Sequence, residues 1–170
     1  MNEITELASA EALFASLKTQ MASSIAFDAK LVGVYSGGAW IADRLKAELS
    51  GNHDVGYIDV SFYRDDLSTA GLKPTVRSTQ IPFSVEGAHI VIVDDVLFTG
   101  RSIRAAINTL FDYGRPASIQ LAVLVDRGGR ELPIAADYVG EARLVAADRM
   151  LALERADDGR FSFKLEPWTR

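Results

Sequence analysis

The sequence predicts an α/β fold, a doubly wound and mostly parallel sheet followed by a C-terminal antiparallel hairpin. Segments with helical periodicity alternate with strand-like segments, the order that places helices on both faces of a parallel sheet. The run from Ile90 to Val93 is apolar and β-branched throughout, as expected for a strand buried on both faces. Near the C-terminus, apolar segments at 150–155 and 161–165 flank Asp158-Gly159, a favourable hairpin turn.

The other elements follow from the spacing of apolar side chains. Steps of three and four residues indicate amphipathic helices, and strict alternation indicates a half-buried strand. The elements expected before the apolar run are a helix at 7–25, a strand at 31–35, a helix through 40–49 and a strand at 57–63. Those expected after it are a helix at 103–111, which Gly114 and Pro116 end, and a buried strand at 119–125.

Residues 64–82 lose this periodicity and collect Asp, Ser, Thr, Gly, Lys and Pro. We therefore expect a long, flexible loop there, and long loops in compact domains often act as lids. A chain of 170 residues has the length of one ordinary domain. We expect residues 1–170 to form a single domain that carries this lid.

The composition excludes several functional classes. The chain has no cysteine, so neither disulfides nor thiolate catalysis is available. Its net charge of −5 provides no general nucleic-acid footprint. No segment approaches the roughly 18 apolar residues needed to span a membrane, and the acidic N-terminus is not followed by the apolar core of a signal peptide. We expect a cytoplasmic protein without a membrane partner.

The most informative segment joins an acid pair to the start of a helix. Asp94 and Asp95 stand where the apolar strand is expected to end, and Thr99-Gly100-Arg101-Ser102 opens the next helix. Free backbone N–H groups and the positive end of the helix dipole make such a turn suitable for a phosphate monoester. Two carboxylates would repel a bare phosphate, so the ligand must bring hydroxyl donors, a cation or both. A ribose 5-phosphate that carries a diphosphate and Mg²⁺ meets all these requirements.

These residues resemble the phosphoribosyl diphosphate (PRPP) signature of the type I phosphoribosyltransferases. Together with residues 63–68 and 114–134, they are similar to the PyrR-type pyrimidine operon attenuators, which have uracil phosphoribosyltransferase activity. The resemblance implies the type I phosphoribosyltransferase fold, formation of UMP and diphosphate from uracil and PRPP, and assembly into a homodimer or larger homo-oligomer. It also implies Mg²⁺ that is carried with PRPP rather than held by metal ligands of the protein.

The resemblance assigns a role to each part of the expected site. Asp94 and Asp95 would bind the ribose hydroxyls and stabilise the cationic transition state, and Thr99, Gly100, Arg101 and Ser102 would bind the 5-phosphate. Ser36, Gly37 and Gly38 match the diphosphate loop, although many relatives carry a basic residue where this chain has Tyr35-Ser36-Gly37. Arg64, at the start of the lid, would contact the diphosphate during catalysis.

Phe98, Asp126 and Arg127 match positions that form the base pocket. Gly129 stands where relatives often carry His. A purely structural alternative for this segment pairs Arg127 and Arg130 with Asp126 and Glu131. The acid that purine phosphoribosyltransferases usually carry is replaced here by Phe98, which favours uracil. His53 and His89 lack partners at catalytic spacing, so we assign them no role.

The resemblance leaves regulation open, because attenuators of this family bind leader mRNA with UMP as effector. Residues 135–158 contain three basic and six acidic side chains, a poor surface for RNA phosphates. We therefore favour the enzyme and expect RNA affinity to be weak or absent. Other interpretations are a purine phosphoribosyltransferase, a receiver-type domain with an acid pair and Mg²⁺, and a non-catalytic nucleotide sensor.

Overall fold

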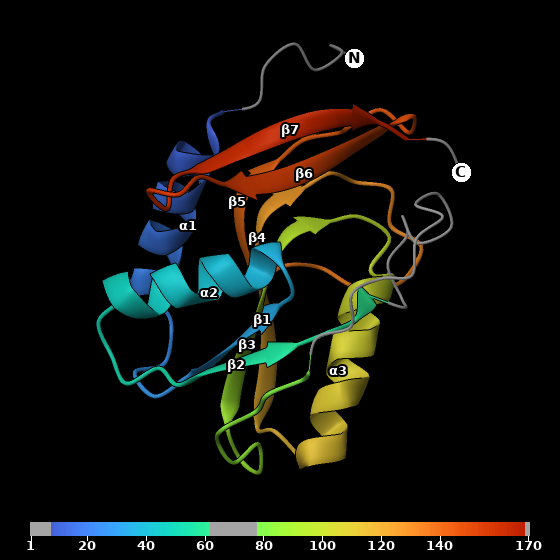
Figure 1. Cartoon of the computed structure of the whole chain (residues 1–170). Coiled ribbons are helices and arrows are strands. Elements are labelled where there is room, and N and C mark those ends of the chain that lie inside the picture. Colours follow the sequence, from blue (N-terminus) through green and yellow to red (C-terminus); the bar gives the residue numbers. More distant parts are fainter. Residues whose placement is uncertain (1–7, 62–77, 169–170) are drawn as a thin grey trace.

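The computed structural model describes residues 8–61 and 78–168. Within these ranges five parallel strands form one sheet, in the order β2-β1-β3-β4-β5 (Figure 1). They are β1 (Lys30–Val34), β2 (Val55–Ile58), β3 (His89–Leu97), β4 (Ser118–Asp126) and β5 (Tyr138–Ala142). The chain runs from β1 to one neighbour, β2, and returns on the other side as β3. The topological switch point therefore lies between β1 and β3, where open α/β sheets bind ligands at the carboxyl ends of their strands.

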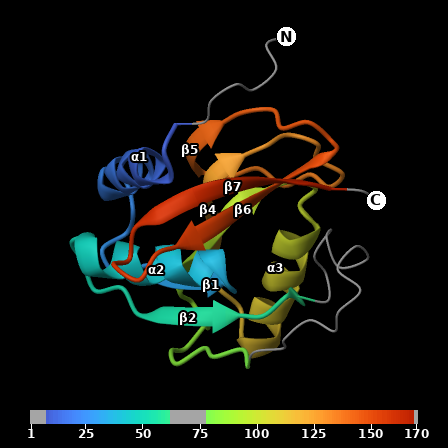
Figure 2. The same ribbon diagram turned by 45° about the horizontal axis from the view of Figure 1, so that its top comes forward.

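Helices cover both faces of the sheet, which confirms the doubly wound prediction. The helices α1 (Ala10–Ala22) and α2 (Gly37–Glu48) pack on one face, and α3 (Arg101–Tyr113) packs on the other (Figures 1 and 2). Alternate strand residues divide between two hydrophobic clusters. Leu31 and Val93 lie in the cluster with α1 and α2, whereas Val32 and Ile92 lie in the cluster with α3. The sheet is thus buried on both faces, as the apolar run predicted.

Two strand boundaries differ from the prediction. Strand β3 continues through the acid pair to Leu97, because β4 still pairs with it there, although its pairing with β1 ends at Val93. The strand expected at 57–63 is instead β2, at Val55–Ile58. Its parallel pairing with β1 ends at Ile58, and the alternating burial then continues to Val60 outside any strand. Beyond Ser61, the segment up to residue 77 lies outside the described residues.

A separate antiparallel hairpin confirms the prediction for the C-terminal region. Its strands β6 (Arg149–Arg155) and β7 (Phe161–Pro167) pair in register around the turn that contains Gly159. Leu151, Leu153 and Phe161 are buried in the cluster that α1 and α2 form with the sheet. The hairpin lies above the carboxyl ends of the strands (Figures 1 and 2).

In the ranges that the structure describes, none of the helices has both the length and the apolar character needed to cross a membrane.

Candidate functional site

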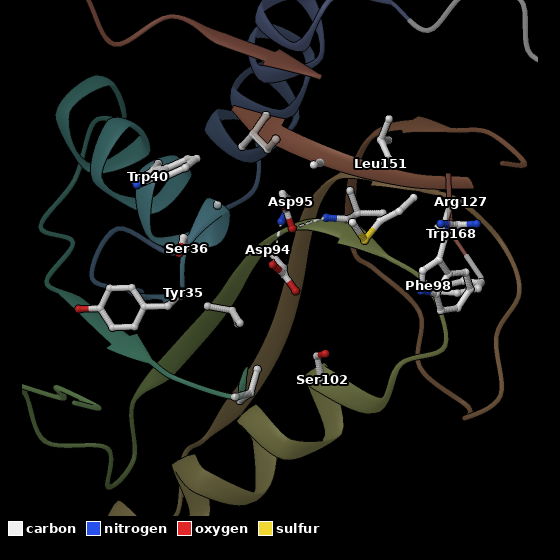
Figure 3. A pocket seen from close by; sticks show the side chains of 17 residues that line it. Tyr35, Ser36, Trp40, Asp94, Asp95, Phe98, Ser102, Arg127, Leu151 and Trp168 are labelled. Carbon is white, nitrogen blue, oxygen red and sulfur yellow. Dashed lines mark hydrogen bonds between the residues drawn. The ribbon is translucent and has the colours of Figure 1, made fainter. Parts of the chain in front are cut away.

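A cavity of about 190 Å³ opens at the switch point between β1 and β3 (Figure 3). Six parts of the chain supply its walls: the turn from β1 into α2, Val60, the end of β3 with the start of α3, Arg127, the hairpin strand β6, and Trp168. Asp94 and Asp95 lie at its centre, between Tyr35 and Ser36 on one side and the group formed by Phe98, Arg127 and Trp168 on the other. Residues from distant parts of the sequence thus meet around the acid pair.

Hydrogen bonds to the backbone orient the two carboxylates. Asp94 is buried, and its Oδ1 accepts a bond of 2.9 Å from the amide of Asp95. The Oδ1 atom of Asp95 in turn accepts a bond of 2.8 Å from the amide of Val96. Both acids therefore belong to the extended end of β3, with their side chains fixed at the base of the cavity.

The turn from β1 into α2 packs directly against the acid pair. A Cβ atom at Gly37 would lie 2.6 Å from Oδ2 of Asp95, and one at Gly38 would collide with the carbonyl oxygen of Val93. Glycine at these two positions lets the N-terminus of α2 approach β3, and the positive end of its dipole faces a carboxylate. Ser36 and Gly37 line the cavity, whereas Gly38 does not and instead packs against the backbone of Val93 and Asp94.

The turn into α3 holds the four residues of the expected phosphate loop in different ways. Thr99 is buried, and its Oγ1 accepts a bond of 3.2 Å from the amide of Arg101. Gly100 is the N-cap and has a φ of 93°, which favours glycine. Ser102 lines the cavity, but the guanidinium of Arg101 pairs with Glu131 at 2.8 Å. Ser102 therefore faces the cavity, whereas Thr99, Gly100 and Arg101 are not among the residues that line it.

Of the three residues expected in the base pocket, two line the cavity and one does not. Phe98 and Arg127 line the cavity, with the guanidinium of Arg127 4.0 Å from the ring centroid of Phe98. Arg127 also donates hydrogen bonds to the carbonyls of Arg149 at 2.9 Å and Ala146 at 3.1 Å, so it supports the segment leading into the hairpin. Asp126 does not line the cavity, because both its carboxylate oxygens accept bonds from Arg130 at 2.6 and 2.7 Å.

The presence of glycine at position 129 is explained by its contact with the Phe98 ring. Gly129 has a φ of 77°, and a Cβ atom there would lie 2.5 Å from Cε2 of Phe98. The Phe98 ring therefore occupies the space that a side chain at position 129 would need.

Several cavity residues were missed by sequence reasoning. Trp40, predicted only as part of an apolar helix stripe, lines the cavity, as do residues 150–153 of β6 and Trp168. The ring of Trp168 packs edge-on against Phe98, with centroids 5.6 Å apart. The hairpin itself was predictable, but its position over the acid pair depends on long-range contacts. A lone tryptophan in a polar tail was the one available signal.

The departure at Tyr35 has a local structural explanation. The Tyr35 ring stacks on Tyr57 with centroids 5.4 Å apart, and the hydroxyl of Tyr57 donates a hydrogen bond to Asp43. Burial, together with the Asp43 carboxylate, raises the pKa of Tyr57 to about 12. An aromatic pair thus supports the turn that leads from β1 into α2.

Residues 64–77 of the expected lid, including Arg64, lie outside the described residues. The last part of the expected loop is described, and there Gln80 exchanges two backbone hydrogen bonds of 2.8 Å with Tyr57. In the described part of the chain, no group of three or more His, Cys, Asp or Glu side chains is placed to hold a metal ion.

An acid pair and a glycine-capped helix start thus lie close together at the switch point of a parallel sheet. This arrangement is suited to a phosphorylated sugar. The phosphoribosyl transferase domain model matches residues 4–146 of the chain. Two proteins named bifunctional protein PyrR are similar: that of Ralstonia nicotianae is 52% identical, covering 94% of this chain and 92% of its own length. That of Nitrosococcus oceani is 43% identical, covering 91% and 90% respectively.

A solved structure supports the fold. The hypoxanthine-guanine phosphoribosyltransferase of Bacillus anthracis aligns with a TM-score of 0.64 at 18% identity, covering 84% of this chain and 85% of its own. The chain therefore belongs to the phosphoribosyltransferase family, and within that family to the PyrR-type proteins.

Proposed function

We propose that this chain transfers the phosphoribosyl group of PRPP to uracil and releases UMP and diphosphate. The observation that carries the proposal is the meeting of the Asp94–Asp95 pair with two glycine-containing helix starts around one cavity. One helix start can bind the 5-phosphate and the other the diphosphate, while the carboxylates between them can accept bonds from the ribose hydroxyls.

In this assignment the 5-phosphate binds Thr99, Gly100, Arg101 and Ser102 at the start of α3. The diphosphate binds at Ser36, Gly37 and Gly38, with Arg64 as a further ligand and Mg²⁺ arriving as the PRPP complex. Uracil lies towards Phe98, where Arg127 and Trp168 support the wall of the cavity. The hairpin covers the base from above, as expected for a reaction that must exclude water.

The chemistry needs no protein nucleophile. The bond from C1 of the ribose to the diphosphate oxygen breaks, and its electrons leave with the diphosphate. The N1 atom of uracil attacks C1 from the opposite face and loses its proton. Asp94 and Asp95 stabilise the positive charge that develops on the ribose, because fixed carboxylates in a water-excluded site interact strongly with it.

The relatives are named bifunctional, so regulation of pyrimidine operons through leader mRNA is the second candidate. The charge of residues 135–158 argues against strong RNA binding there. Arg143 forms an ion pair with Glu141, and the guanidinium of Arg155 lies 4.9 Å from the ring centroid of Trp40. We propose enzyme activity as the principal function, within one domain at 1–170 that assembles as a homodimer or a larger homo-oligomer.

The test is UMP formation from uracil and PRPP with Mg²⁺, with hypoxanthine, guanine and orotate as parallel substrates. The proposal predicts turnover that depends on uracil and on Mg²⁺. Turnover of a purine base alone would contradict the assignment of Phe98 to a uracil site. Binding of PRPP or UMP without turnover of any base would instead indicate a nucleotide sensor.

A further inference from the structure

Backbone hydrogen bonds connect two loops that follow neighbouring strands. One leads from β3 into α3 and the other follows β4. Leu97 accepts a backbone hydrogen bond of 3.0 Å from Arg127, and the carbonyl of Thr99 accepts bonds from the amides of Glu131 at 3.0 Å and Leu132 at 3.2 Å. The phosphate loop is therefore supported along one side by the segment 127–132.

The Arg130 side chain lies at the centre of this contact. Its Nε donates to the carbonyl of Ile134 at 2.8 Å, one terminal nitrogen donates to the carbonyl of Phe98, and the other binds both carboxylate oxygens of Asp126. All three guanidinium nitrogens are thus engaged. The planar fork of arginine can make these bonds together, whereas the point charge of lysine cannot.

These contacts fix the two ends of the turn that begins α3. At one end, Phe98 lines the cavity and its carbonyl is bound by Arg130. Near the other, a Cβ atom at Gly100 would lie 3.1 Å from the side chain of Ile134, whose carbonyl is also bound by Arg130. Displacement of Arg130 would therefore release both the aromatic wall of the cavity and the support beneath the helix start.

We propose that Arg130 is a positioning residue for the transfer reaction, one that arranges the phosphate loop and the Phe98 wall before PRPP and uracil bind. The guanidinium does not line the cavity, so it acts through the two loops rather than on substrate. This role rests on the proposed function. Without Arg130, PRPP has to order the loops as it binds, so its KM rises while the reacting groups and kcat are largely retained.

The test compares Arg130→Ala and Arg130→Lys with Arg115→Ala, an exposed arginine that precedes the amino end of β4, whereas Arg130 follows its carboxyl end. We expect both Arg130 variants to raise the KM for PRPP about 10- to 100-fold, the range for lost positioning contacts. The expected change in kcat is less than about fivefold, and Arg115→Ala should match the wild type. Added guanidinium ion at millimolar concentration should lower the KM of Arg130→Ala, because the vacated site is partly accessible to solvent. It should not change the KM of Arg130→Lys.

A folded Arg130→Ala variant with the wild-type KM, or one whose raised KM does not respond to guanidinium, would overturn the role. If Arg130→Ala fails to fold, Arg130→Lys decides the question through its KM at an unchanged unfolding temperature. A wild-type chain that does not turn over uracil would defeat the proposed function alone. The same comparison would then be made with PRPP dissociation constants measured by calorimetry.

Discussion

Removing the charge of Glu11 should loosen the hairpin that covers the site. The Glu11 carboxylate binds the guanidinium of Arg44 through two hydrogen bonds of 2.8 Å and accepts a bond of 2.7 Å from the amide of Phe161. The same guanidinium lies 4.2 Å from the ring centroid of Phe14 and 5.1 Å from that of Phe161. One carboxylate therefore connects α1, α2 and β7 across 150 residues of sequence.

The Glu11→Gln substitution replaces one acceptor oxygen with an amide NH₂ group. This group cannot accept the hydrogen bond from Arg44, so two donors face each other. A hydrogen bond to a charged group contributes about 1.5–3 kcal/mol, whereas an exposed ion pair contributes about 0–1 kcal/mol. The two side chains are 33% and 30% exposed, so an intermediate loss of about 1–2 kcal/mol is expected. For a domain of this size the unfolding temperature should fall by about 2–8 °C.

The loss should depend on pH in a defined direction. The Arg44 hydrogen bonds hold the pKa of Glu11 below its ordinary value of 4.5. The stabilising contribution is therefore complete above that ordinary value and disappears as pH falls through the lower folded-state value. Thermal unfolding followed by circular dichroism should separate wild type from Glu11→Gln at pH 7, and the difference should narrow below about pH 4.5.

A matched control lies on the same hairpin. Glu166 pairs with Lys164 at 2.8 Å, with the lysine side chain 58% exposed, so Glu166→Gln should change the unfolding temperature little. If Glu11→Gln is as stable as the wild type at pH 7, or if Glu166→Gln loses as much stability, the contacts of Glu11 with Arg44 and Phe161 do not hold the hairpin as argued.

Three further outcomes follow from the site. Gly38→Ala should lower the free energy of unfolding by about 1–3 kcal/mol, since the new Cβ atom would collide with the carbonyl oxygen of Val93. Urea denaturation measures this loss, and a variant as stable as the wild type would contradict the close packing of α2 against β3. Gly129→Ala should raise the KM for uracil, because the new methyl group displaces the Phe98 ring; an unchanged KM would separate Phe98 from base binding. Leader RNA should bind weakly in filter assays, and a salt-dependent submicromolar complex would contradict the charge argument.

The strand and the helix start around the acid pair could be predicted from the sequence because the signals for them are local. The apolar run before Asp94 identified β3, and Thr99 to Ser102 identified the start of α3, since periodicity and capping residues act within a few positions. The end of β3 was misplaced because its extension to Leu97 depends on pairing with β4, a partner that periodicity does not reveal. The expected roles of the site residues remain predictions.

Long-range contacts explain what could not be foreseen. The Asp158-Gly159 turn predicted the hairpin, but its docking depends on Arg44, Glu11 and Phe161, which come from three distant segments. Arg127 and Asp126 were expected to act together, yet one lines the cavity and the other pairs with Arg130. Only the folded arrangement distinguishes adjacent residues whose side chains take different directions.

The most direct test of the central claim is the turnover number of Asp95→Asn for UMP formation at saturating PRPP and uracil. Asparagine keeps the size of the side chain and the oxygen that accepts the Val96 amide, so the unfolding temperature should stay close to that of the wild type. If the carboxylate stabilises the developing ribose cation, turnover should fall by about a hundredfold or more. Wild-type turnover by a folded Asp95→Asn variant would contradict the assignment of this acid to catalysis.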